Sequence, residues 1–176
     1  MELNSRMMDG SISYDPGGRC EPVASGPGAR QEDKIERLKE VLLFEGCSQR
    51  QLRSVARIAR VFDVAADTVI TRAGEPGDEF FLIIDGTARA DVSADKHVLL
   101  PPGEFFGEMS LLDGGPRSAT VVAHTPLRLL VISRRNFSGL LEDVPGLTQN
   151  LLVTLSRRVR QAEERAERLR AASRGA

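Results

Sequence analysis

Apolar residues along this chain of 176 residues recur first with a helical period and then with a period of two. Two early groups have the three- and four-residue spacing of one helical face, and Ser48, just before the second group, suits an N-cap. These groups are Ile35, Leu38, Val41 and Leu42, then Leu52, Val55 and Ala56. Residues 1–30 show no sustained period and contain DPGG and SGPGAR. This segment cannot bury enough surface to offset the entropy of ordering, so we expect a flexible tail.

From about Ile58 the period becomes two, which indicates short strands rich in Val, Ile, Phe and Thr. Turn sequences separate seven such segments, at 60–65, 68–73, 79–86, 87–93, 97–100, 119–124 and 127–133. The pair Asp85-Gly86 between two apolar runs predicts a tight hairpin. So many short strands favour a sandwich or a barrel.

Helical patterns return after the last strand candidate. Ser133 is the expected N-cap of a helix that runs through Leu141, and Pro145 interrupts the pattern. A final helix is expected from about Leu147 to Ala172.

Six residues of the final helix alternate by three and four, the spacing of a coiled-coil seam: Leu152, Leu155, Val159, Ala162, Ala166 and Leu169. We expect a homodimer through this helix, with Arg158 and Glu163 at flanking positions able to pair across a two-fold axis. The alternative is that the seam packs on the protein's own barrel. The segment from Arg157 onward holds seven arginines and three glutamates. A solvated amphipathic face explains that charge more simply than nucleic-acid contact does.

Composition narrows the class of protein. The hydrophobic fraction of 41% fits a globular domain with an appendage, and no apolar run reaches the roughly 20 residues that span a bilayer. No secretory signal is recognisable at the N-terminus. With only two cysteines, neither a disulfide framework nor a metal-ligand pattern is expected, and a reducing cytoplasm is the expected location. His97 and His124 are isolated and no nucleophile pattern appears, so we expect no enzyme and no cofactor.

The segment FFGEMSLLDGGPRSATV places two opposite charges, Glu108 and Arg117, in an apolar, glycine-rich stretch. Amides that follow Gly107, the guanidinium of Arg117 and the hydroxyl of Ser118 could converge on one phosphate. A carboxylate next to such an anion suits a hydroxyl donor, and a ribose 2′-OH is the natural one. The alternative is a buried Glu108–Arg117 ion pair that only packs.

The longer segment FFGEMSLLDGGPRSATVVA resembles the phosphate-binding cassette of cyclic nucleotide-binding domains, with its Phe-Gly-Glu, short helix and Pro-Arg-Ser-Ala-Thr. Such domains occur in the catabolite-activator family of bacterial regulators, in protein kinase A regulatory subunits and in cyclic-nucleotide-gated channels. AGEPGDEFFLIIDGTARADV is similar to the family's preceding turn and strand pair. The resemblance covers roughly residues 35–160. It implies a mainly β fold, an eight-stranded jelly-roll (double-stranded β-helix) barrel with flanking N-terminal and C-terminal helices. Residues 1–30 would be the tail, 31–145 the binding domain and 146–174 a C-terminal lid or dimerisation helix.

The resemblance also implies roles for nine residues. Glu108 would accept from the ribose 2′-OH. The expected backbone contacts come from Gly107, Met109 and Ser110, the phosphate contacts from Arg117, Ser118 and Ala119, and the purine contacts from Val98 and Leu100. The chain departs from the family pattern at two places. Ala66-Asp67 stands where a Gly is common, and Ala162-Glu163 stands where the catabolite-activator type contacts adenine with a Thr-Ser pair.

The function implied is that of a cytoplasmic sensor that binds cAMP, with cGMP as the alternative that Ser118 leaves open. It would relay occupancy through its last helix to an unknown downstream protein, without a membrane segment. The chain ends at Ala176 with no helix-turn-helix following, so DNA binding is not expected. Two rival readings are a transcription regulator of the catabolite-activator type, or a fragment of one, and an interaction module that binds no ligand.

Overall fold

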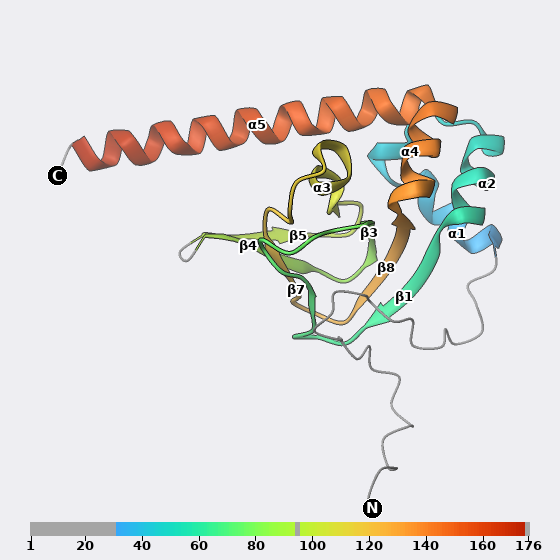
Figure 1. The fold of residues 1–176 in the computed structure, drawn as a ribbon, viewed down its shortest axis with the longest axis horizontal. Helices are drawn as coiled ribbons and strands as arrows, with labels where there is room; N and C mark the ends of the chain where they lie inside the picture. The colour runs from blue at the N-terminus through green and yellow to red at the C-terminus, as the bar shows by residue number, and fades with distance from the viewer. Residues whose placement is uncertain (1–30, 94–95, 175–176) are drawn as a thin grey trace, which may run out of the picture.

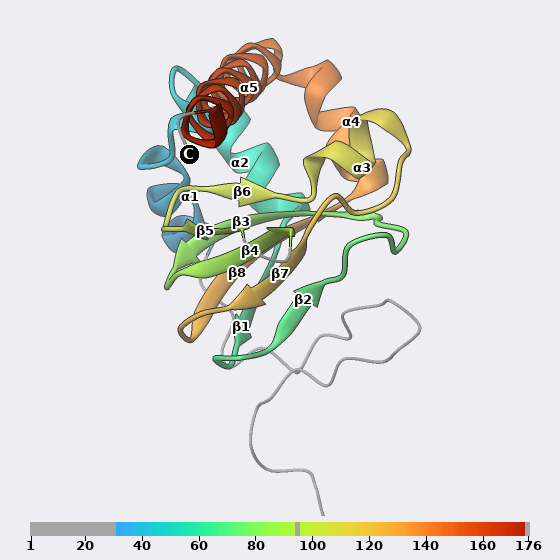
Figure 2. The ribbon, with the colours of Figure 1, turned by 90° about the vertical axis from the view of Figure 1, so that its left-hand side faces the viewer.

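Two four-stranded antiparallel sheets form the centre of the molecule (Figures 1 and 2). The structure is a computed structural model that describes residues 31–93 and 96–174, so the predicted tail at 1–30 lies outside the described residues. One sheet has the strand order β1-β8-β3-β6 and the other β2-β7-β4-β5. The strands are β1 (Arg60–Val64), β2 (Val69–Thr71), β3 (Glu79–Asp85), β4 (Ala88–Ser93), β5 (Lys96–Leu100), β6 (Phe105–Phe106), β7 (Thr120–Ala123) and β8 (Leu127–Ser133).

Eight strands with flanking helices were expected, and both features are confirmed. Within the described ranges the hydrogen-bonded ladders run inside each sheet, so backbone pairing does not close the two sheets into one continuous barrel. The seven strand segments read from the sequence correspond to all strands except β6, which is only two residues long and lies at the start of the cassette. A two-residue strand is too short to show a period.

The predicted hairpin at Asp85-Gly86 is wrong. Strand β3 pairs with β6 and β8, whereas β4 pairs with β5 and β7, so the turn carries the chain from one sheet to the other. Gly86 has φ of 81°, and a Cβ there would lie 2.9 Å from the Thr125 hydroxyl oxygen. Gly86 therefore lies in a turn that connects the two sheets, and not in a hairpin.

Strand β3 is buried on both faces, which explains its unbroken apolar run. Phe81 and Ile83 point into the cluster between the two sheets. Phe80 and Leu82 point the other way, into a second cluster that the helices complete. The rings of Phe80 and Phe137 stack there at a centroid distance of 4.9 Å. A strand covered on both sides does not alternate between apolar and polar residues.

The helices gather over the outer face of the β1-β8-β3-β6 sheet (Figure 1). They are α1 (Gln31–Lys39), the 3₁₀ turn η1 (Leu42–Phe44), α2 (Gln49–Ile58), α3 (Glu108–Asp113), α4 (Arg134–Asp143) and α5 (Pro145–Arg174). Ser48 is the predicted N-cap of α2, and its side chain and that of Gln51 form a reciprocal capping box. Ser133 occupies the N-cap position of α4 but makes no side-chain cap. Leu42, expected on a buried face, is 68% exposed and lies in η1, beyond the end of α1 at Lys39.

Helix α5 starts on the domain and then extends past it (Figure 1). Pro145 occupies its first turn, where a missing N–H costs nothing, so the proline separates α4 from α5 as predicted. Leu151 is buried in the helix-covered core, and Leu155 packs against it. Leu152 and Val159, two residues of the predicted seam, are each 56% exposed. Among the described helices, none is both long enough and apolar enough to cross a bilayer.

Candidate functional site

The cassette is shaped by two left-handed glycines that bracket a very short helix. Gly107 (φ 85°) precedes α3 and Gly114 (φ 72°) ends it. Only glycine adopts this backbone region without strain, so the two residues fix where the helix begins and ends. Within α3, Glu108 and Ser110 are buried and Met109 is largely exposed. The exposed Met109 side chain fits an expected role through its backbone alone.

Arg117 is held inside this cassette by backbone oxygens. Arg117 is only 7% exposed. Its Nη1 group donates to the carbonyl oxygen of Glu79 at 2.8 Å and to that of Gly107 at 3.0 Å. The guanidinium also lies 5.4 Å from the centre of the Phe81 ring. Because a guanidinium keeps its charge at any ordinary pH, these contacts fix a permanent positive charge at one place.

Two glycines make room for that guanidinium. A Cβ on Gly77 would overlap the Arg117 side chain, and a Cβ on Gly107 would lie 2.7 Å from the Glu79 carbonyl oxygen and also meet Arg117. The backbone of Arg117 is itself tied to the loop before β3, since its N–H donates to the Glu75 carbonyl at 2.8 Å. The sequence GEPGD is thus part of the site, because its Gly77 leaves the space that Arg117 fills.

Glu108 is ion-paired with Arg158 of α5, a residue that we expected at a dimer interface. The Arg158 Nη1 group donates to Glu108 Oε1 at 3.1 Å. The Nη2 group of Arg158 donates to Glu104 Oε2 at 2.8 Å and to the Phe105 carbonyl at 2.7 Å. Its guanidinium carbon lies 4.3 Å from the centre of the Phe105 ring. Helix α5 is therefore tied to the cassette at this point.

The contacts of Arg158 correct one expectation and add one site residue. Arg158 was expected to pair across a two-fold axis, yet in the structure it binds its own domain. The signal was present in the spacing: Leu151, Leu155 and Arg158 are at i, i+4 and i+7, the face of α5 that turns toward the domain. The predicted seam shares Leu155 with this face but otherwise follows the neighbouring one, through Leu152 and Val159.

Burial raises the pKa of the Glu108 carboxyl, and the positive charge of Arg158, more than that of Arg117, opposes the rise. Burial likewise raises the pKa of Glu79, against the opposing charge of Arg117. Glu108 forms a salt bridge with Arg158, and Nη1 of Arg117 donates to the carbonyls of Glu79 and Gly107.

Val98 and Leu100, the residues predicted to contact a purine, lie on the inner face of β5. They pair directly with Ala90 and Ala88 of β4, both buried between the sheets. Directly opposite residues of an antiparallel pair share a face, so small alanines here face larger half-buried side chains. Leu100 packs against the inter-sheet cluster.

The remaining predicted residues divide between this cluster and the surface. Ala119 packs on the inter-sheet cluster, and its carbonyl accepts from the Thr71 hydroxyl at 3.2 Å. Ser118 is exposed, and so are Ala162 and Glu163 on α5. Asp67 carries the left-handed conformation (φ 64°) where a Gly is common, a conformation that Asp tolerates better than most residues. The hydroxyl of Ser110 is buried and has no hydrogen-bond partner within the part of the chain that the structure describes.

Comparison with known proteins places this site in a known context. The family model described as the cyclic nucleotide-binding domain matches residues 61–144. A cyclic nucleotide-gated potassium channel of Mesorhizobium japonicum is 39% identical over 109 residues, which cover 62% of this chain and 30% of that protein. The crystal structure of the Thermus thermophilus catabolite activator protein aligns with a TM-score of 0.66 and 31% identity, over 73% of this chain and 62% of that one.

The regulatory domain of Toxoplasma gondii protein kinase A, crystallised with cAMP, aligns with a TM-score of 0.65 and 28% identity, over 73% of this chain and 50% of that one. The chain thus spans from less than a third to about three fifths of these relatives.

Proposed function

Residues 61–144 belong to the cyclic nucleotide-binding domain family, and on this premise we propose that the chain binds a 3′,5′-cyclic nucleotide, in the first place cAMP. One observation carries the proposal. Arg117, 7% exposed, is fixed by two backbone carbonyls in a space that Gly77 and Gly107 leave open. A permanent charge held this tightly is suited to a phosphate, whose oxygens match the planar guanidinium.

The other predicted residues complete the proposed binding mode. Glu108 accepts from the ribose 2′-OH, and Ser118 and the Ala119 amide assist Arg117 at the cyclic phosphate. Gly107, Met109 and Ser110 contribute backbone groups, while Val98 and Leu100 contact the purine from β5. The exposed Ser118 leaves cGMP as the alternative ligand. No cofactor and no catalytic step are part of this proposal.

The regulatory part of the proposal concerns α5. A nucleotide favours the state in which the cassette and α5 fit it together, and the position of α5 then reports occupancy. The Arg158 contacts support this idea, because they join α5 to the carboxylate proposed to hold the ribose. The exposed Leu152 and Val159 support a homodimer through α5, and the proposed location is the cytoplasm. The jelly-roll topology and a downstream protein partner belong to this proposal as well.

Calorimetry with cAMP and cGMP tests the proposal, on the wild type, on Arg117→Ala and on Arg128→Ala as a control. Arg128 has the same charge, but it is exposed and pairs with Asp63 on the outer surface. Arg117→Ala is expected to lose about tenfold to a hundredfold in affinity, because hydrogen bonds to charged groups contribute about 1.5–3 kcal/mol. Arg128→Ala is expected to bind as the wild type does.

Two outcomes contradict the proposal. No binding heat from the wild-type protein at near-millimolar nucleotide would favour the ligand-free interaction module. Binding that survives Arg117→Ala unchanged would move the phosphate site away from the cassette. A gel shift on random duplex DNA, repeated at higher salt, tests the rival role in transcription.

A further inference from the structure

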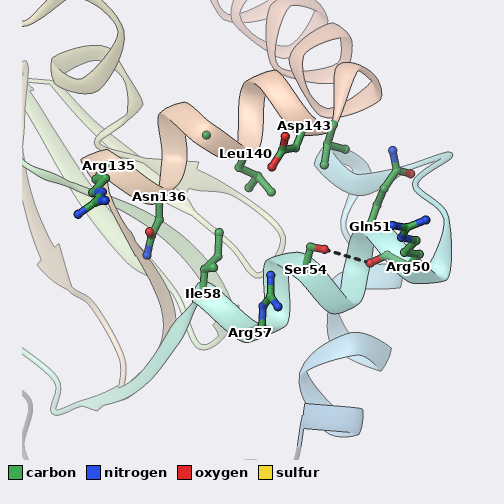
Figure 3. Close-up of a pocket in the computed structure, with 11 residues that line it drawn as sticks. Arg50, Gln51, Ser54, Arg57, Ile58, Arg135, Asn136, Leu140 and Asp143 are labelled. Atoms are coloured by element: carbon green, nitrogen blue, oxygen red, sulfur yellow. Dashed lines mark hydrogen bonds between the residues drawn. The ribbon is translucent and has the colours of Figure 1, made fainter.

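A hollow of about 520 Å³ lies between α2 and α4, on residues that have no part in the proposed nucleotide site (Figure 3). We call it the α2–α4 groove. Its lining from α2 is Arg50, Gln51, Ser54, Arg57 and Ile58, and from α4 and the residue after it Arg135, Asn136, Gly139, Leu140, Asp143 and Val144. We propose that the α2–α4 groove binds an acidic segment of a partner protein. This inference does not depend on nucleotide binding.

The charge of the groove carries the first step. The lining holds three arginines, Arg50, Arg57 and Arg135, and one acidic residue, Asp143. Across residues 31–93 and 96–174, none of these three guanidinium groups has a hydrogen-bond or ion-pair partner. The whole chain has a formal net charge of -1, so this local excess of positive charge is not a property of the surface at large.

Other arginines of the same domain show that pairing is available to this fold. Arg134, the neighbour of Arg135, donates to the Asp78 carboxylate at 2.9 Å and to the Gly77 carbonyl at 2.8 Å. Arg128 makes two hydrogen bonds with Asp63. The groove arginines therefore stand apart from these paired ones, and a guanidinium is suited to bind a carboxylate through two parallel hydrogen bonds.

The groove is also kept open by a glycine inside a helix. Gly139 lies within α4, its φ is not in the left-handed region, and a Cβ added there would meet nothing within 4 Å. The backbone of this helix therefore does not need a glycine, although glycine costs about 0.5–1 kcal/mol at such a position. The missing side chain leaves open space at this point of the groove lining.

The shape of the groove favours a peptide over a nucleic acid. Leu140 and Val144 are buried, and Ile58 is half-buried, so they give the groove an apolar floor that suits an apolar side chain. Asp143 at one end opposes the closely spaced phosphates of a nucleic acid strand more than it opposes separated carboxylates. An acidic segment with an apolar residue among its carboxylates satisfies both features.

The groove adjoins the start of α5, which begins one residue after Val144. Helix α4 packs against α5, and Val144 and Leu147 share the helix-covered core. A segment that contacts α2 and α4 together would hold α4 in place beside the junction with α5. A partner bound here is thus placed to influence the helix that extends from the domain.

The test uses the full chain and a fluorescein-labelled peptide, Glu-Glu-Leu-Glu-Glu-Leu, with the same peptide carrying Gln for every Glu as the second probe. Anisotropy is expected to show saturable binding of the acidic peptide alone. Arg57→Glu and Arg135→Glu are each expected to weaken it about tenfold, since attraction becomes repulsion. Gly139→Leu is expected to weaken it by filling the space without a change of charge.

Arg53→Glu is the matched control, because Arg53 is an exposed arginine of α2 outside the groove lining. Its binding is expected to stay within twofold of the wild type, and thermal unfolding checks that every variant remains folded. Equal loss for Arg53→Glu would show attraction to the general surface, and equal binding of the Gln peptide would exclude charge recognition. The proposal would also be overturned if the acidic peptide did not saturate up to about millimolar protein. It would be overturned as well if a random DNA duplex bound more tightly than the peptide and this binding were lost in Arg57→Glu and Arg135→Glu.

Discussion

Replacing Arg158 with Gln tests how α5 acts on the ribose end of the site. Arg158 contacts Glu108 through Oε1, which leaves the second carboxylate oxygen outside this contact. We expect the variant to bind cAMP more weakly and 2′-deoxy-cAMP almost as well as the wild type does. The deoxynucleotide has no 2′-OH to donate to Glu108, so it should not depend on how that carboxylate is held.

The size of the effect follows from the contacts. A hydrogen bond between charged groups contributes about 1.5–3 kcal/mol when buried. The Glu108 side chain is 5% exposed, but that of Arg158 is 31% exposed, so solvent screening favours the lower half of the range. The expected loss for cAMP is about ten- to thirtyfold, against about twofold or less for 2′-deoxy-cAMP.

The pH dependence gives a readout that loss of packing alone would not produce. Burial raises the pKa of Glu108 and Arg158 opposes that rise. Removal of Arg158 therefore raises the pKa further, and a larger share of Glu108 is protonated at a given pH. Because the proposed acceptor is the carboxylate, the deficit in cAMP affinity should be largest at low pH and shrink as pH rises.

Calorimetric titrations of both nucleotides over a pH series measure these effects. Arg160→Gln is the control, since Arg160 is an exposed arginine of the same helix. An equal loss for the two nucleotides, or a deficit that does not change with pH, would refute the reasoning.

Four further predictions concern folding, packing and assembly. The raised pKa of Glu108 makes the folded state lose stability as pH rises above 4.5, the ordinary pKa of a Glu side chain. Glu108→Gln removes this titration, so the free energy of unfolding should depend less on pH in that range. Urea titrations at several pH values measure the free energy of unfolding. Gly77→Ala should weaken cAMP binding, measured by calorimetry, and cost about 1–3 kcal/mol of stability, because its Cβ would overlap the Arg117 side chain. Gly139→Ala should instead raise the free energy of unfolding by about 0.5–1 kcal/mol in the same titrations. Val159→Glu should shift a dimer toward monomer in sedimentation velocity, and an unchanged dimer would place the interface elsewhere.

The sequence predicted the elements whose signals are local. The capping box at Ser48 and Gln51 joins residues three apart, and the helix after Gly107 begins at a glycine that the cassette sequence displays. Strand periods located seven of the eight strands in the described part of the chain, because each was long enough to alternate or to form an apolar run. In all these cases the residues that determine the structure are neighbours in the chain.

Features that depend on distant parts of the chain were not predictable in the same way. Asp85-Gly86 has the composition of a hairpin turn, yet β3 and β4 belong to different sheets. Their sheets are determined by pairing with β8 and β6 for β3, and with β7 and β5 for β4, strands that lie further along the chain. The structural partner of Glu108 is fifty residues away on α5. Leu151, Leu155 and Arg158 share one face of α5, but the longer predicted seam also passes through Leu155 and was the more prominent pattern in the sequence.

The candidate site combines both kinds of information. Glu108 and Arg117 are close in sequence, and the cassette brings them together through Gly107, whose carbonyl accepts from Arg117. Their surroundings come from elsewhere: Gly77 makes room for one charge, and Arg158 of α5 neutralises the other. If a ribose engages Glu108, the free energy of that contact and the free energy of docking α5 are linked, and the linkage acts equally in both directions. A ligand that binds more tightly when α5 is docked must therefore also hold α5 in place, and under the proposed binding mode the carboxylate of Glu108 would both contact the ribose and report its presence to the helix.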